Sequence, residues 1–252
     1  MGSDEKPRLY GPLAAVAITV GIYFAAQLFA GILISIVPVI KHWSIARTND
    51  WLANNAWAMF LFVLLVESVT LALLYAVMRR RKQGFRGLGL NKLHLKYVVY
   101  ALAGFGVYFV LYILGLIVAK ALVPSLDLDQ KQEIGFDTSM RGAALLPIFL
   151  SLVILPPVTE EIVARGFLFG GLRTKLPFAG AAVITSIMFA AAHLGEASNG
   201  LLWVAAVDTF ILSIVLCYLR EKTGSLWPPI GVHMIKNGLA FIVLFNIAQY
   251  LR

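Results

Sequence analysis

The sequence predicts an all-α fold, a polytopic bundle of about seven transmembrane helices with a kinked or broken fourth helix, on the strength of three observations. First, 60% of the 252 residues are hydrophobic and 13% are charged, which is far from the composition of a soluble domain. Second, stretches of about 20 apolar residues recur along the chain, with charges largely in the gaps. Third, such stretches cross a bilayer as helices, because lipid leaves backbone groups no other hydrogen-bond partner.

The predicted spans follow one another at short intervals along the chain. They are residues 12–39, 57–78, 97–119, 143–172, 178–193, 200–219 and 228–250. The longest polar stretches between them, 41–55, 79–96 and 120–141, leave no room for a soluble domain. We therefore expect residues 1–252 to form a single integral membrane domain. The only cysteine, Cys217, lies in an apolar run, so no disulfide can form within one chain.

The net charge of +8 is interpreted as a topology signal and not as a nucleic-acid-binding surface. In the seven-span arrangement, 13 Lys and Arg residues lie on the N-terminal side of the membrane and 6 on the other. By the positive-inside rule the N-terminus is cytosolic and the C-terminus is outside. No organelle-targeting extension precedes the first span, so we expect a prokaryotic plasma membrane.

The fourth span contains prolines that interrupt a regular helix. Pro147, Pro156 and Pro157 remove backbone donors just before Glu160 and Glu161. In a membrane such a break is tolerated where protein or water covers it, so both glutamates are expected to line a hydrated cavity. Glu67, in the second span, is open to a functional and to a structural interpretation, and we leave it outside the site.

Ionisable and polar residues gather in the last hundred residues, within spans where charge is costly. These are Glu160, Glu161, Arg165, His193, His233, Lys236 and Asn237. A shared polar centre accounts for their placement.

The spacing of these residues assigns them different tasks. Glu161 and Arg165 are four apart and can pair on one helix face, which leaves Glu160 pointing about 100° away and available for chemistry. A carboxylate beside a neutral imidazole, for which His193 is the candidate, can deprotonate water. His233 and Asn237 also share one face and offer two donors to an oxyanion.

Three short runs carry a resemblance to a known family. Glu160 to Arg165, Phe189 to His193 and His233 to Asn237 resemble the EExxxR, FxxxH and HxxxN motifs of the CAAX-protease and bacteriocin-processing (CPBP, or Abi) family of intramembrane proteases, similar to type II CAAX prenyl endopeptidases. The resemblance covers about residues 143–240, the catalytic motif region. The prenyl endopeptidases have one helix more than the seven counted here.

The resemblance implies a glutamate-type endopeptidase and a role for each motif residue. Glu160 and His193 would activate water, and His233 and Asn237 would form the oxyanion hole, with Glu161, Arg165 and Phe189 as structural support. The implied substrate is a peptide or protein, lipidated or not, in CAAX-type processing or in bacteriocin processing and immunity. No cofactor is expected.

Two alternatives remain open at this stage. A zinc protease could use Glu160, Glu161, His193 and His233, with Glu196 one helical turn after His193, although the chain has no HExxH motif. A non-proteolytic membrane protein of immunity, binding or scaffolding could use the same polar cluster only to hold helices together.

One geometric difficulty follows from the predicted span ends. Glu160 and His193 would lie about 18 and 24 Å from the cytosolic ends of their helices, but His233 only about 8 Å from its own. We therefore expect a strong tilt, a re-entrant start of the last span or a shift of the boundaries by a turn.

Overall fold

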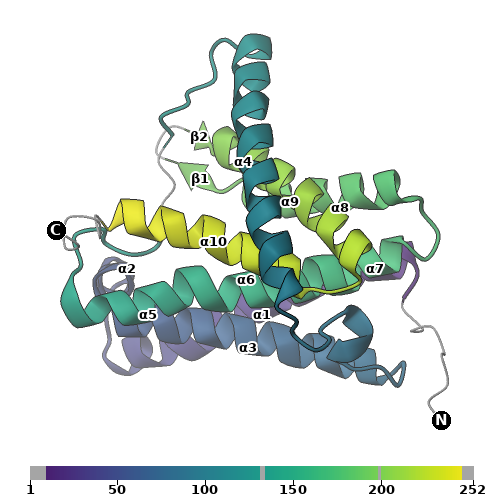
Figure 1. Ribbon diagram of the computed structural model, residues 1–252. Helices are drawn as coiled ribbons and strands as arrows, with labels where there is room; N and C mark the ends of the chain where they lie inside the picture. Colours follow the sequence, from purple (N-terminus) through teal and green to yellow (C-terminus); the bar gives the residue numbers. More distant parts are fainter. Residues whose placement is uncertain (1–9, 131–133, 198–199, 246–252) are drawn as a thin grey trace.

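The computed structural model describes residues 10–130, 134–197 and 200–245. Within these ranges the chain is almost entirely helical, which confirms the all-α prediction (Figure 1). The long helices are α1 (Pro12–Ile40), α3 (Ala56–Arg79), α4 (Lys96–Leu122), α8 (Phe178–Ala192), α9 (Trp203–Thr223) and α10 (Trp227–Leu244). The shorter elements outside residues 142–172 are α2 (Ile45–Asn54), η1 (Phe85–Leu88) and the antiparallel pair β1 (Glu196–Ala197) and β2 (Gly200–Leu201).

Residues 142–172 form one composite helix. Its successive segments are η2 (Gly142–Ala144), α5 (Leu145–Phe149), η3 (Leu150–Ile154), α6 (Leu155–Glu161), η4 (Ile162–Leu168) and α7 (Phe169–Leu172). Both η3 and η4 are π-helical, with one on each side of the prolines and glutamates of α6. The irregularity expected of the fourth span is therefore present as two widened turns within a continuous helix.

Five of the described helices are long and apolar enough to cross a membrane, namely α1, α3, α4, the composite helix and α9. The apolar helix α8 has 15 residues and α10 has 18 described residues. Most predicted boundaries hold within a few residues, but α9 begins at Trp203 because the two short strands occupy the residues before it. The predicted end of the last span, 246–250, lies outside the described residues.

The helices pack around the composite helix. In Figure 1, α1 and α3 run along one side of the composite helix and α10 along the other, and α4 crosses this layer at a steep angle. A close approach at Gly171 lets α1 reach the composite helix, because a Cβ at that position would lie 2.5 Å from the Cβ of Ala15. This packing places α1, α3 and α10 against the segment that carries the paired glutamates.

The start of α10 is fixed by the loop that precedes α4. The turn between α9 and α10 contains Gly224 in the left-handed conformation (φ 65°), which ends α9. After it, the backbone N–H of Leu226 donates to the carbonyl of Gly89 at 2.9 Å, and the Ser225 hydroxyl bonds to Asn91. The helix α10 begins at Trp227 directly after this turn, so only residues 224–226 separate it from α9.

Candidate active site

A buried ion pair stands at the centre of the composite helix. The Nη1 atom of Arg165 donates to Oε1 of Glu161 at 2.9 Å, and both side chains are fully buried. This is the pair that the four-residue spacing predicted. It neutralises two charges that would otherwise be costly to bury.

Glu161 has a second partner from another helix. Nδ1 of His233, on α10, lies 2.9 Å from the same Oε1 atom, and the His233 side chain is also buried. Since a carboxylate only accepts, Nδ1 carries the proton and donates it. This contact was not predicted, because its partners are 72 residues apart and no spacing rule connects them.

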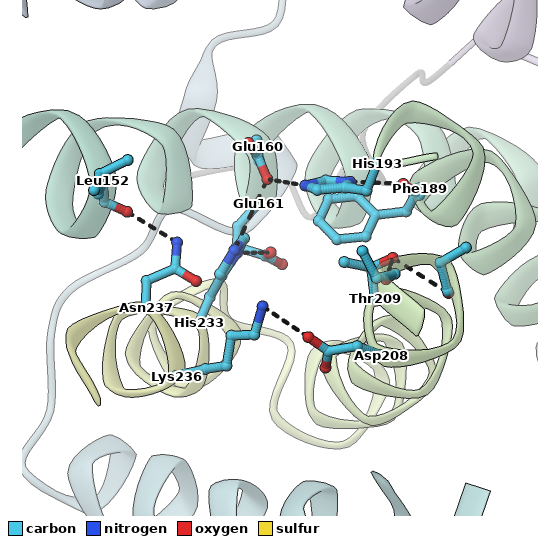
Figure 2. A network of polar contacts seen from close by, with 12 residues as sticks. Leu152, Glu160, Glu161, Phe189, His193, Asp208, Thr209, His233, Lys236 and Asn237 are labelled. Carbon is cyan, nitrogen blue, oxygen red and sulfur yellow. Dashed lines mark hydrogen bonds and ion pairs between the residues drawn. The ribbon is translucent and has the colours of Figure 1, made fainter. Parts of the chain in front are cut away.

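Glu160 points into the space between two imidazoles, as Figure 2 shows. Its Oε2 atom lies 3.9 Å from Nε2 of His193 and 3.9 Å from Nε2 of His233. These separations are too long for direct hydrogen bonds. Since one carboxylate reaches both rings, the mismatch in depth inferred from predicted span ends does not exist in the fold.

The orientation of His193 follows from the end of α8. The ring Nδ1 atom of His193 lies 2.8 Å from the carbonyl oxygen of Phe189, one turn earlier, and must donate to it. A neutral His193 therefore presents Nε2 as an acceptor toward Glu160.

Phe189 packs among the charged and polar groups of the site. Its ring lies under the Arg165 guanidinium at 4.3 Å, 4.6 Å from the ring centroid of His193 and 6.0 Å from that of His233. The FxxxH phenylalanine thus contacts residues of all three motifs. Such packing restricts the rotation of both imidazoles.

Asn237 contacts the composite helix through its side-chain amide. Its Nδ2 atom donates to the carbonyl oxygen of Leu152, in η3, at 2.9 Å. The composite helix has no backbone donor for the Leu152 carbonyl, because the residues four and five positions after Leu152 are Pro156 and Pro157, which lack an N–H. One amide hydrogen of Asn237 is thereby used, and one remains for another acceptor.

A cavity of about 670 Å³ adjoins Glu160 and His193. Residues from α1, α3, the composite helix and α8 line it, including exposed apolar side chains of α1 such as Tyr23 and Phe24. Glu67, which we left outside the site, lines the same cavity and interacts electrostatically with Glu160. The sequence signal for Glu67 was its charge within an apolar span, but nothing local connected it with residues a hundred positions later.

A second polar cluster lies on the side of α10 toward α9. Lys236 Nζ lies 3.0 Å from Oδ2 of Asp208 on α9 (Figure 2). The other oxygen of Asp208 accepts a short hydrogen bond from the hydroxyl of Tyr108 on α4. Lys236, predicted to belong to the polar centre, instead joins α10 to α9 and α4.

The zinc alternative relied on donor residues at helical spacing. The helix α8 ends at Ala192, so His193 and Glu196 do not share a helix, and the Glu196 side chain lies outside the described residues. Across the described parts of the chain, no group of three or more His, Cys, Asp or Glu side chains is arranged to hold a metal ion.

Comparison with known proteins places this site in a family context. Residues 142–239 match the family described as type II CAAX prenyl endopeptidase Rce1-like. The protein "Putative membrane peptidase YdiL" of Bacillus subtilis (strain 168) is 32% identical over 94 residues, which is 37% of this chain and 35% of the relative. No solved structure matches the chain. These matches confirm the resemblance over the segment that holds the three motifs.

Proposed function

We propose that this chain is an intramembrane endopeptidase of the glutamate type, because residues 142–239 match the type II CAAX prenyl endopeptidase Rce1-like family. The observation that carries the proposal is the position of Glu160, whose Oε2 atom faces Nε2 of His193 and Nε2 of His233 at 3.9 Å each. A carboxylate that is free of structural partners, beside an imidazole that can accept, is the arrangement that general-base catalysis needs.

In the proposed first step, one water molecule donates hydrogen bonds to Glu160 and to Nε2 of His193. Glu160 takes a proton from this water as its oxygen bonds to the carbonyl carbon of the scissile peptide. His193 holds the water in place, because its Nδ1–H is committed to the Phe189 carbonyl. The reaction needs no charge to move farther than one hydrogen bond.

The oxyanion that forms would be held by donors from α10. Since Nδ1 of His233 donates to Glu161, its Nε2 atom can donate only when the ring carries both protons. The carboxylates of Glu160 and Glu161 together would then balance the positive charges of His233 and Arg165. The second amide hydrogen of Asn237 is the other proposed donor. Glu160 then returns its proton to the amine nitrogen as the carbon–nitrogen bond breaks, which releases two peptides and restores the site.

The substrate we propose is a peptide or protein reached from within the bilayer. The exposed apolar side chains of α1 along the cavity support entry of a lipidated segment, and CAAX-type peptides and bacteriocin precursors are candidate classes. We further propose a prokaryotic plasma membrane with a cytosolic N-terminus, for which the distribution of Lys and Arg is the support.

Cleavage of a panel of farnesylated and unmodified peptides by detergent-purified protein tests this proposal. New peptide termini, identified by mass spectrometry, should appear with the wild type and be absent with Glu160→Gln. A chelator and a metal assay on the same samples test the zinc alternative. Full activity of Glu160→Gln would show that the catalytic assignment is wrong, whereas peptide binding by the wild type without any cleavage would establish the non-proteolytic binding or immunity function instead.

A further inference from the structure

The cavity beside the proposed catalytic water is larger than one water needs. At about 670 Å³ it has room for several side chains of a bound peptide. Helices α1 and α3, which run along the composite helix in Figure 1, provide the wall facing Glu160. Groups on that wall would therefore contact substrate residues next to the scissile bond.

The charged residues that line the cavity do not balance. Glu67 and Glu160 are both acidic and interact with each other, and no Lys or Arg is among the described lining residues. Arg165, the nearest cation in sequence, is held by Glu161 away from this space. Burial and mutual repulsion disfavour the ionisation of both carboxyl groups in a cavity with mostly apolar walls, and a ligand that brings positive charge offsets this cost.

Buried hydroxyl groups on two walls also lack partners. The Oγ1 atoms of Thr185, on α8, and Thr19, on α1, are buried without a hydrogen bond, and both residues line the cavity. The Thr185 side chain is fully buried. Unsatisfied buried hydroxyls are uncommon, and a rotation about χ1 would turn either hydroxyl toward the cavity, where a polar ligand supplies the missing hydrogen bond.

We propose that Glu67 is a specificity-determining residue that binds a lysine or arginine side chain of the peptide substrate, close to the scissile bond. After such a rotation, Thr19 and Thr185 would accept hydrogen bonds from the ammonium or guanidinium group or from the adjacent peptide backbone. Carboxylates and hydroxyls accept hydrogen bonds from these cations, whereas an acidic side chain would add a third acidic group to the cavity and be rejected. This inference rests on the proposed protease function, because Glu160 must lie at the scissile bond.

Pairs of peptides that differ at one position, with lysine in one and glutamine in the other, test the inference. The lysine is moved residue by residue through the sequence around the cleavage site. At one position, wild type should favour the lysine peptide in kcat/KM by about 30-fold, which is typical of a desolvated charge pair. Glu67→Gln should bring the ratio close to one, and Glu67→Asp should keep part of the preference. Glu221→Gln, which removes a carboxylate outside the cavity, should leave the ratio as in wild type.

Peptide binding, measured with fluorescent versions of the same pairs, separates this inference from the protease proposal. A binding preference for lysine that disappears in Glu67→Gln would support the subsite even if no peptide were cleaved. Efficient cleavage with equal ratios in wild type and Glu67→Gln at every position would overturn the subsite and leave the protease function standing. Glu67→Lys offers a further check, since it should favour peptides with glutamate at the responsive position.

Discussion

The side-chain amide of Asn237 donates a hydrogen bond to the main-chain carbonyl of Leu152, which its own helix cannot satisfy. In an α-helix or a π-helix this carbonyl would accept from the N–H of the residue four or five positions later, but those residues are Pro156 and Pro157, which have none. The HxxxN asparagine therefore supports the irregular helix of the paired glutamates as well as being a proposed oxyanion donor. The two roles of Asn237 can be separated by experiment.

Asn237→Ala should lower turnover by about 100- to 1000-fold through loss of an oxyanion donor. It should also lower the free energy of unfolding by about 1–3 kcal/mol, because the Leu152 carbonyl is left unpaired. Adding Pro156→Ala restores a backbone N–H four residues after Leu152 and should recover stability without recovering turnover. Thermal unfolding and steady-state kinetics on the single and double variants measure both effects.

Asn237→Asp should be at least as damaging to turnover, since it exchanges an amide donor for an acceptor. Equal losses of peptide binding and turnover in Asn237→Ala would instead identify a ground-state peptide clamp. That result would favour the non-proteolytic binding function.

Glu160→Gln and Glu161→Gln should differ in their effects on activity and stability. Glu160→Gln should abolish cleavage with little change in melting temperature, because Glu160 has no direct hydrogen-bond partner at Oε2 in the described residues. Glu161→Gln should lower the free energy of unfolding by about 3–5 kcal/mol, because it leaves the buried Arg165 guanidinium unpaired and weakens the contact with His233. Equal melting temperatures for the two variants would contradict this division.

Lys236→Met should destabilise the packing of α10 against α9 by about 2 kcal/mol, between the values for exposed and buried ion pairs. The pair is only partly exposed, with 23% of the Lys236 side chain and 16% of Asp208 accessible. The double variant Lys236→Met with Asp208→Asn should lose less unfolding free energy than the two single variants lose in sum. Additive losses in unfolding experiments would show that the two charges do not interact.

The two ends of α4 should be accessible from opposite sides of the membrane. In a Cys217→Ala background, a cysteine at the exposed position Lys92 should react with impermeant reagents only from the cytosolic side, and one at Ser125 only from the other. The Cys217→Ala protein without added cysteines is the control. Labelling of both positions from one side would rule out the seven-span topology.

Composition and helix periodicity were enough to predict the local features of this protein. Apolar stretches of membrane-spanning length specified the helices, and the four-residue spacing specified the pairing of Glu161 with Arg165. The same spacing placed Glu160 on another face, where the structure has it between two imidazoles. These features were predictable because helix periodicity alone fixes which side chains within one helix are neighbours.

Which helices contact one another, and which of their residues lie at the same height, could not be predicted without the packed fold. The contact of Glu161 with His233, the bond from Asn237 to Leu152 and the position of Glu67 beside Glu160 all join residues far apart in sequence. The same is true of the common height of Glu160, His193 and His233, which their distances from their own helix ends did not predict. Relative heights and rotations depend on side-chain packing between helices, including the π-helical turns and the loop that holds the start of α10, and no single-helix periodicity encodes them.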